Sequence, residues 1–192
     1  MRAAPAPAAA PQSILALRAH VEREEAVEAF THGLAGGVRR LALGPLRSVA
    51  DIYVPFRLYQ VSVGRDRNEE RLVLGLDAVA GALDLYRFDD VPRSADLVHV
   101  RTRNHLGPVL STSAASGILT TRVKRIVYQR VGFLAAAPFR LDVQPVDQML
   151  HVPYWVGFVG RGEAASLVVM DAVRRQIEGV KARRLIGEWL SG

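Results

Sequence analysis

Basic side chains are the chemically most conspicuous groups in this sequence. The chain has 192 residues, and its 25 lysines and arginines outnumber 19 aspartates and glutamates, which gives a net charge of +6. Only Lys124 and Lys181 are lysines. Guanidinium groups bind carboxylates and phosphates in a forked geometry, so this composition favours acidic partners. The candidates for a basic surface are Arg101, Arg103, Lys124 and Arg125 around the middle, and Arg174, Arg175, Lys181, Arg183 and Arg184 near the end.

The aromatic residues near these arginines help to distinguish a nucleic-acid partner from a protein partner. A nucleic-acid surface combines basic residues with exposed aromatic side chains on one face. Tyr128 and Trp189 are the aromatic residues close to the two groups, and we expect both to be buried. The sequence therefore favours a contact with a protein or with a second copy of the chain. Arginine-mediated nucleic-acid binding is the alternative.

A second candidate site is the loop of small residues from Leu110 to Gly117. Backbone N–H groups at the start of a helix, together with hydroxyls, can hold a phosphate or sulfate. The candidates for such an anion site are Ser111, Ser113, Ser116, Gly117 and Arg122. The glycine spacing and the Lys-Ser/Thr pair of a phosphate-binding Walker loop are missing, so an ordinary linker with a helix cap is the favoured interpretation.

Catalytic and metal-binding patterns are missing from the sequence. Asp77 and Asp171 occupy matched positions and would suit acid–base work, but aspartate at a strand end more commonly caps the following turn. The five histidines have no metal-ligand spacing, and no cysteine is present. We therefore expect no metal and no cofactor. Catalytic groups that are scattered along a sequence leave no motif, but nothing in this sequence favours an enzyme, and we expect no enzymatic activity.

The most informative feature is an internal repeat. A Val-Pro-aromatic signature, a Gly-Arg pair and an Asp-Ala-Val signature occur twice in the same order, at spacings that differ by an even number of residues. Side chains alternate along a strand, so an even difference keeps the same face inward in both copies. The residues that define the repeat are Val54, Pro55, Phe56 and Asp77 in the first copy and Val152, Pro153, Tyr154 and Asp171 in the second.

Each copy predicts a β-hairpin preceded by a helix. Apolar residues at helical spacing predict helices near 21–34 and 117–131, and Ser13 is a candidate cap for an earlier helical turn at 14–17. The residues that follow Asp171 are good helix formers, but their apolar positions fall on two sides of a helical wheel. We expect a break near Gly179 and a terminal helix docked through Trp189.

These elements define the expected fold and its units. We expect an α+β protein formed by tandem duplication of a helix plus antiparallel β-hairpin unit, with a helical C-terminus. The units are a flexible Pro/Ala arm (1–12), a first repeat (13–92), a linker (93–116) and a second repeat (117–192), as separate lobes or as one continuous domain. Residues 72–88 resemble the small PepSY-type modules, which are regarded as binding or inhibitory domains; no functional residue follows from this resemblance.

The expected function follows from the duplicated scaffold, the basic surface and the missing motifs. We expect a non-catalytic protein-binding or assembly module whose partner is another protein or the chain itself. Nucleic-acid binding and small-anion binding are the alternatives. No apolar stretch is long enough for a membrane-spanning helix, and the absence of disulfides suits a cytoplasmic location.

Overall fold

The structure is a computed structural model, and it describes residues 10–32, 44–65, 68–131, 139–161 and 165–192. These residues form a mixed α+β fold with eight strands and three helices. The strands belong to one sheet with the path β4-β3-β2-β6-β1-β5. Off this path, β7 pairs with β6, and β8 pairs with β7. The predicted α+β class is therefore confirmed.

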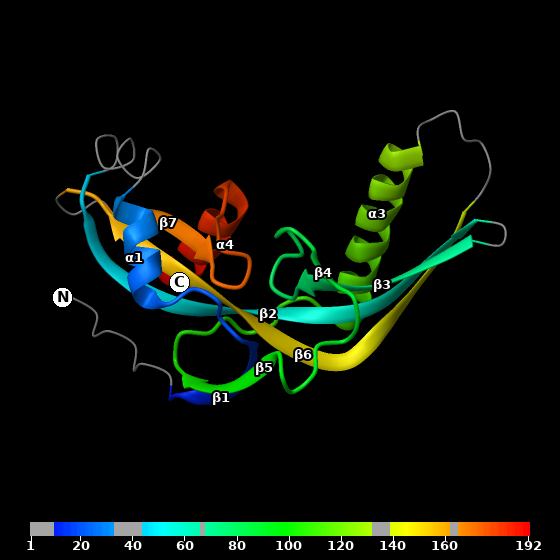
Figure 1. The fold of residues 1–192 in the computed structure, drawn as a ribbon, viewed down its shortest axis with the longest axis horizontal. Helices are drawn as coiled ribbons and strands as arrows, with labels where there is room; N and C mark the ends of the chain where they lie inside the picture. Colours follow the sequence, from blue (N-terminus) through cyan, green and yellow to red (C-terminus); the bar gives the residue numbers. More distant parts are fainter. Residues whose placement is uncertain (1–9, 33–43, 66–67, 132–138, 162–164) are drawn as a thin grey trace.

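Two long strands, β2 (Leu46–Arg65) and β6 (Arg140–Val159), form the backbone of the sheet. They pair antiparallel and cross the molecule from end to end as a strongly curved ribbon (Figure 1). Val54 lies opposite Val152 in this pairing, and both side chains are fully buried. The two Val-Pro-aromatic signatures thus meet each other at the centre of the sheet.

Each long strand continues into a hairpin. β2 turns into β3 (Asn68–Asp77), and β6 turns into β7 (Ser166–Asp171). Phe56 is opposite Asp77 in the first hairpin, and Tyr154 is opposite Asp171 in the second. A short strand extends each hairpin, namely β4 (Tyr86–Phe88) beside β3 and β8 (Gln176–Ile177) beside β7. The two hairpins therefore lie at opposite ends of the ribbon.

The turn after each hairpin has the same backbone contacts. The N–H of Ala78 donates to the carbonyl of Pro55 at 2.8 Å, and the N–H of Ala172 donates to that of Pro153 at 3.1 Å. Four residues after each aspartate the backbone is left-handed, with φ of 64° at Gly81 and 58° at Arg175. Glycine reaches this conformation without strain, whereas Arg175 is a non-glycine residue held there by its turn.

Three helices cover the sheet: α1 (Arg23–Thr31), α3 (Thr112–Val131) and α4 (Val180–Ser191). Ala26 and Phe30 of α1 share an apolar cluster with Val159 of β6 and Val168 of β7. In another cluster, α3 packs against the other hairpin through Ala115, Leu119 and Val123, which contact Tyr59, Val61, Leu74 and Leu76. Helices α1 and α3 therefore each cover the hairpin that belongs to the other half of the sequence, and Figure 1 shows them at opposite ends of the ribbon.

Two elements differ from the sequence prediction near the centre. The segment expected to be a helical turn capped by Ser13 is β1 (Gln12–Leu17), which pairs parallel with β6 and antiparallel with β5 (Leu97–Thr102). The segment 93–116, expected to be a linker, contains β5 and the first turn of α3. Short apolar runs fit a strand as well as a helix. β1 and β5 are strands because they pair with each other, and β1 also pairs with β6.

The C-terminal region also differs in part. Residues after Asp171 form a turn and β8, and α4 begins only after Gly179, which is its N-cap. The start of α4 after Gly179 agrees with the predicted break and with a helix near the C-terminus, but the helix does not dock through Trp189. Its buried residues are Ala182, Leu185 and Ile186, whereas the Trp189 side chain is 37% exposed.

Candidate binding surfaces

The matched aspartates are built into the fold. Asp77 is fully buried, and its two carboxylate oxygens accept backbone N–H bonds from Ala80, Gly81 and Leu83 at 2.8–2.9 Å. The equally buried Asp171 accepts the N–H groups of Val173 and Arg174. Both carboxylates hold the turns that follow them, and this geometry agrees with the structural role favoured by the sequence.

A tyrosine connects the two hairpins. The hydroxyl of Tyr86, in β4, donates to the Asp171 carboxylate, and the Tyr86 ring packs edge-on against Phe56 at 5.3 Å. The guanidinium of Arg174 lies over the Tyr86 ring, 3.7 Å from the ring centroid. Burial is the main reason why the pKa of Tyr86 is raised above its usual value, and the nearby Asp171 raises it further. This tyrosine therefore acts as a proton donor in a packed contact.

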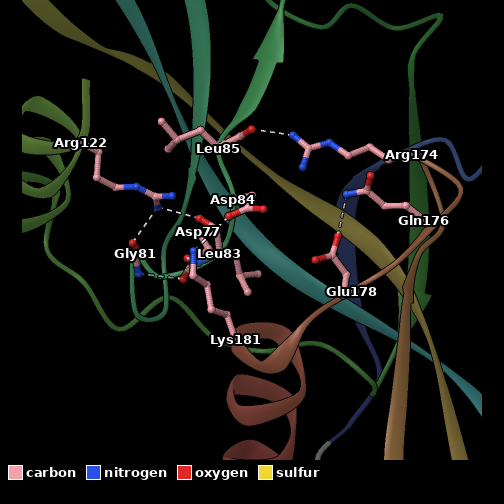
Figure 2. A network of polar contacts seen from close by, with 10 residues as sticks. All are labelled: Asp77, Gly81, Leu83, Asp84, Leu85, Arg122, Arg174, Gln176, Glu178 and Lys181. Atoms are coloured by element: carbon pink, nitrogen blue, oxygen red, sulfur yellow. Dashed lines mark hydrogen bonds and ion pairs between the residues drawn. The ribbon is translucent and has the colours of Figure 1, made fainter. Parts of the chain in front are cut away.

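One residue of the predicted anion site, Arg122, and two of the candidate basic residues, Arg174 and Lys181, hold the turn from Gly81 to Leu85 (Figure 2). Arg122 of α3 donates to the carbonyls of Gly81 at 3.0 Å and Leu83 at 2.6 Å. From the opposite side, Arg174 donates to Leu85 at 2.6 Å and Lys181 pairs with Asp84 at 3.1 Å. These side chains bind the protein's own turn.

The small-residue loop forms the N-cap of α3. The hydroxyl oxygen of Ser111 accepts the N–H of Ala114 at 3.2 Å and lies 3.1 Å from the Ser113 hydroxyl. Ser116 is half-buried and Gly117 is exposed, one to two turns further along the helix. The structure thus brings Ser111 and Ser113 together, while the guanidinium of Arg122 contacts the 81–85 turn. Anion binding at this loop stays a prediction.

The basic group near the C-terminus is largely neutralised by internal ion pairs. Arg175 pairs with Glu25 at 3.0 Å and Arg184 with Glu188 at 2.8 Å, in addition to the pair of Lys181 with Asp84. Arg183 is exposed and has no ion pair in the part of the chain that the structure describes. Internal partners therefore neutralise most of this group.

The basic residues on the exposed side of α3 differ from the C-terminal group in their charge environment. Thr121, Lys124, Arg125 and Tyr128 follow one another at spacings of three, one and three residues, which places them on one side of a helix, and all four are exposed. We call these four residues the α3 basic face. Neither Lys124 nor Arg125 has an ion pair within the described residues, and the sequence of α3 contains no acidic residue.

The exposure of the aromatic residues corrects the sequence analysis. Tyr128 was expected to be buried, but its side chain is 58% exposed, and its ring edge contacts Phe139 at 5.2 Å. The helix turns Tyr128 outward because Ala115, Leu119 and Val123 already fill its inner side. Arg101 and Arg103 are also exposed, but they lie at and just after the end of β5, by the central strands.

Two hollows lined by described residues combine acidic and basic or polar side chains, and neither was predicted. The larger, of about 680 Å³, lies between the end of β1 and the segment after β4. Its lining combines the basic residues Arg18, His20, Arg87 and Arg93 with the acidic residues Asp89, Asp90 and Asp96. Because the lining comes from distant parts of the sequence, no local motif could have revealed it.

The second hollow, of about 450 Å³, lies on the surface of β2, β3 and β6, and we call it the sheet groove. Its polar lining residues are Gln60, Ser62, Glu69, Arg71, Asp89, Asp90, Asp142 and Gln144. Arg71 pairs with Glu69 at 3.3 Å and lowers the pKa of that carboxyl. The hydrogen bond from the Val91 N–H lowers the pKa of Asp90, and Arg93, paired with Asp90 at 2.6 Å, lowers it further. Asp89 and Asp142 have no ion pair in the described residues, so the groove is acidic.

The histidines form no metal centre in the part of the chain described. His105 and His151 have ring centroids 6.0 Å apart, but no group of three or more metal-binding side chains occurs among the described residues. His151 is buried and contacts the carbonyl of Leu15 at 3.2 Å. Burial lowers the pKa of His151, and the nearby His105 lowers it further.

Comparison with known proteins gives no relative for this chain. No protein-family model, no curated protein and no solved structure matches it. The resemblance of residues 72–88 to PepSY-type modules therefore gains no support. None of the helices in the described ranges is both long and apolar enough to cross a membrane.

Proposed function

We propose that this chain is a non-catalytic binding and assembly module that engages an acidic protein surface through the α3 basic face. The observation that carries the proposal is the stripe of Lys124, Arg125 and Tyr128 on the outer side of a helix that has no acidic residue. The two cations have no internal ion pair among the described residues. A partner carboxylate would meet cations that no internal group already neutralises.

The composition of this face also suits a protein contact. Tyrosine and arginine are enriched at protein interfaces, where a tyrosine ring gives a large contact area with few rotatable bonds. Tyr128 is exposed between the cations and is supported by Phe139. A tyrosine among cations also fits stacking on nucleic-acid bases, so nucleic-acid binding is the second candidate.

We infer that the scaffold beneath this face arose by duplication of one helix-plus-hairpin unit. The matched contacts around Pro55 and Pro153, the matched aspartate turns and the pairing of Val54 with Val152 support this inference. The matching extends to the short strands β4 and β8. It does not extend to α4, which follows only the second copy.

Fluorescence anisotropy with two labelled probes tests the proposed function. The probes are a poly-glutamate peptide, which represents an acidic protein surface, and a single-stranded oligonucleotide of the same charge. We expect salt-sensitive binding of poly-glutamate, weakened about tenfold or more in a Lys124→Glu/Arg125→Glu variant. The matched control is Arg23→Glu/Arg183→Glu, which makes the same charge change at two exposed positions away from α3.

The outcomes separate the two candidate functions. Equal loss of binding in both variants would mean that net charge alone drives the contact, and the α3 basic face would not be the site. Clearly tighter binding of the oligonucleotide, lost in the Lys124→Glu/Arg125→Glu variant, would replace the protein-binding proposal with the nucleic-acid one.

A further inference from the structure

We propose that the partner of the α3 basic face is the sheet groove of a second copy of this chain. The inference rests on the proposed function, because it names the protein that the same face would bind. Lys124 and Arg125 on the face, and Asp89 and Asp142 in the groove, are charged groups without ion pairs in the described residues. The two surfaces therefore offer two cations to two carboxylates.

The face and the groove lie on opposite sides of the same strands. Along β2, Tyr59 belongs to the apolar cluster beneath α3, Gln60 and Ser62 line the groove, and Val61 between them contributes to both. The register agrees, because Ser62 is opposite Arg71 in β3 and opposite Asp142 in β6. Since the sheet separates the two surfaces, α3 of one chain can reach only the groove of another chain.

The size of the groove fits side chains better than a whole helix. A helix with its side chains is about 10–12 Å across, which is too wide to enter a hollow of about 450 Å³. The long arms of Lys124 and Arg125 can enter while α3 stays at the rim. Gln60 and Gln144 add hydrogen-bonding groups for the Tyr128 hydroxyl.

The placement also decides the symmetry of the assembly. A face on one side of the sheet and a groove on the other make a head-to-tail contact, in which a bound pair of copies still has one free face and one free groove. Repetition of this contact forms a ring if the rotation between copies closes and an open chain if it does not. A simple two-fold dimer is not expected.

Sedimentation velocity over a range of protein concentrations tests this proposal. The unmodified chain is expected to form larger species at low salt and to dissociate at high salt, since salt screens exposed charges. A Lys124→Glu/Arg125→Glu variant and an Asp89→Lys/Asp142→Lys variant should each be monomeric, because like charges then face each other. The Arg23→Glu/Arg183→Glu variant is the control and should associate like the unmodified chain.

A mixture of the two charge-reversed variants is the decisive sample. Their altered surfaces are complementary, so an equimolar mixture should regain the association that each variant lost. Circular dichroism first establishes that every variant is folded. A monomeric unmodified chain, or a mixture that stays monomeric, would overturn the proposal. If such a monomer still binds poly-glutamate through Lys124 and Arg125, the proposed function stands and only the identity of the partner is wrong.

Discussion

At the scale of single residues, the buried aspartates show how one side chain can organise a whole turn. Asp77 accepts hydrogen bonds from three backbone N–H groups, and those of Gly81 and Leu83 would otherwise be buried without a partner. Its position at a strand end, before small residues, was sufficient to predict a structural role. The contact of Asp171 with Tyr86 could not be predicted, because 85 residues separate them in the sequence.

Replacement of Asp77 should therefore be costly. Asp77→Ala leaves two buried donors and one partly buried donor without their acceptor, and we expect the free energy of unfolding to fall by about 3–5 kcal/mol. Urea denaturation followed by circular dichroism measures this change. The matched control is Asp84→Ala in the same turn, where loss of the exposed pair with Lys181 should cost no more than about 1 kcal/mol. Equal effects of the two substitutions would contradict the assigned role.

His151 makes stability depend on pH in a defined direction. Its pKa in the folded chain is lower than the ordinary value of 6.5, because burial disfavours the charged ring. Below pH 6.5 the unfolded chain therefore binds more protons than the folded one. The stability that comes from the neutral ring is complete above pH 6.5. It is lost as the pH falls from 6.5 through the lower pKa of His151 in the folded chain.

A His151→Gln variant should remove this contribution to the pH dependence. Denaturant unfolding between pH 8 and about pH 5 should show the stability of the unmodified chain falling more steeply on acidification than that of the variant. The effect of Glu178, whose pKa is raised mainly by burial, is common to both proteins and cancels in the difference. Parallel curves would contradict the account of His151.

At the scale of elements, the sequence predicted the hairpins and the helices upstream of them but not how they pack. Periodicity identified α1 and α3, and the signature residues identified β2, β3, β6 and β7. The good helix formers after Asp171 form a turn and β8 because that segment pairs with β7. The packing of α1 and α3, each on the hairpin of the other half, depends on contacts distant in sequence, which local patterns do not encode.

Alanine substitutions at two glycines test this packing, because one should destabilise the chain and the other should stabilise it. A Cβ added at Gly157 in β6 would lie 2.8 Å from the Phe30 ring of α1, so Gly157→Ala should destabilise the chain by about 1–3 kcal/mol. At Gly187 inside α4 the added Cβ would meet Leu167 at an ordinary 3.5 Å, and alanine is the better helix former. Gly187→Ala should therefore stabilise the chain by about 0.5–1 kcal/mol.

Thermal and urea unfolding of the two variants measure both effects. The comparison is informative because both substitutions add the same methyl group. A neutral Gly157→Ala variant would mean that α1 does not press against β6 at this point. A destabilised Gly187→Ala variant would contradict the packing of α4 on β7.

At the scale of the whole molecule, the important property is how charge is distributed rather than its total. The sequence identified Lys124 and Arg125 together with the arginines near the C-terminus, and it could not separate them. The structure separates them because Arg175, Lys181 and Arg184 find acidic partners within the chain. The sheet groove was not predictable, since its residues come from β2, β3, β6 and the segment after β4.

Zero-length cross-linking of amines to carboxylates is the most direct test of the proposed contact between the α3 basic face of one chain and the sheet groove of another. Lys124 and Lys181 are the only lysines, so each cross-link can be assigned by mass spectrometry in an equal mixture of isotopically light and heavy chains. Lys181 should join Asp84 within one chain, as an internal control. We predict that Lys124 joins Asp89 or Asp142 between light and heavy chains; cross-links of Lys124 to its own chain alone would contradict the account.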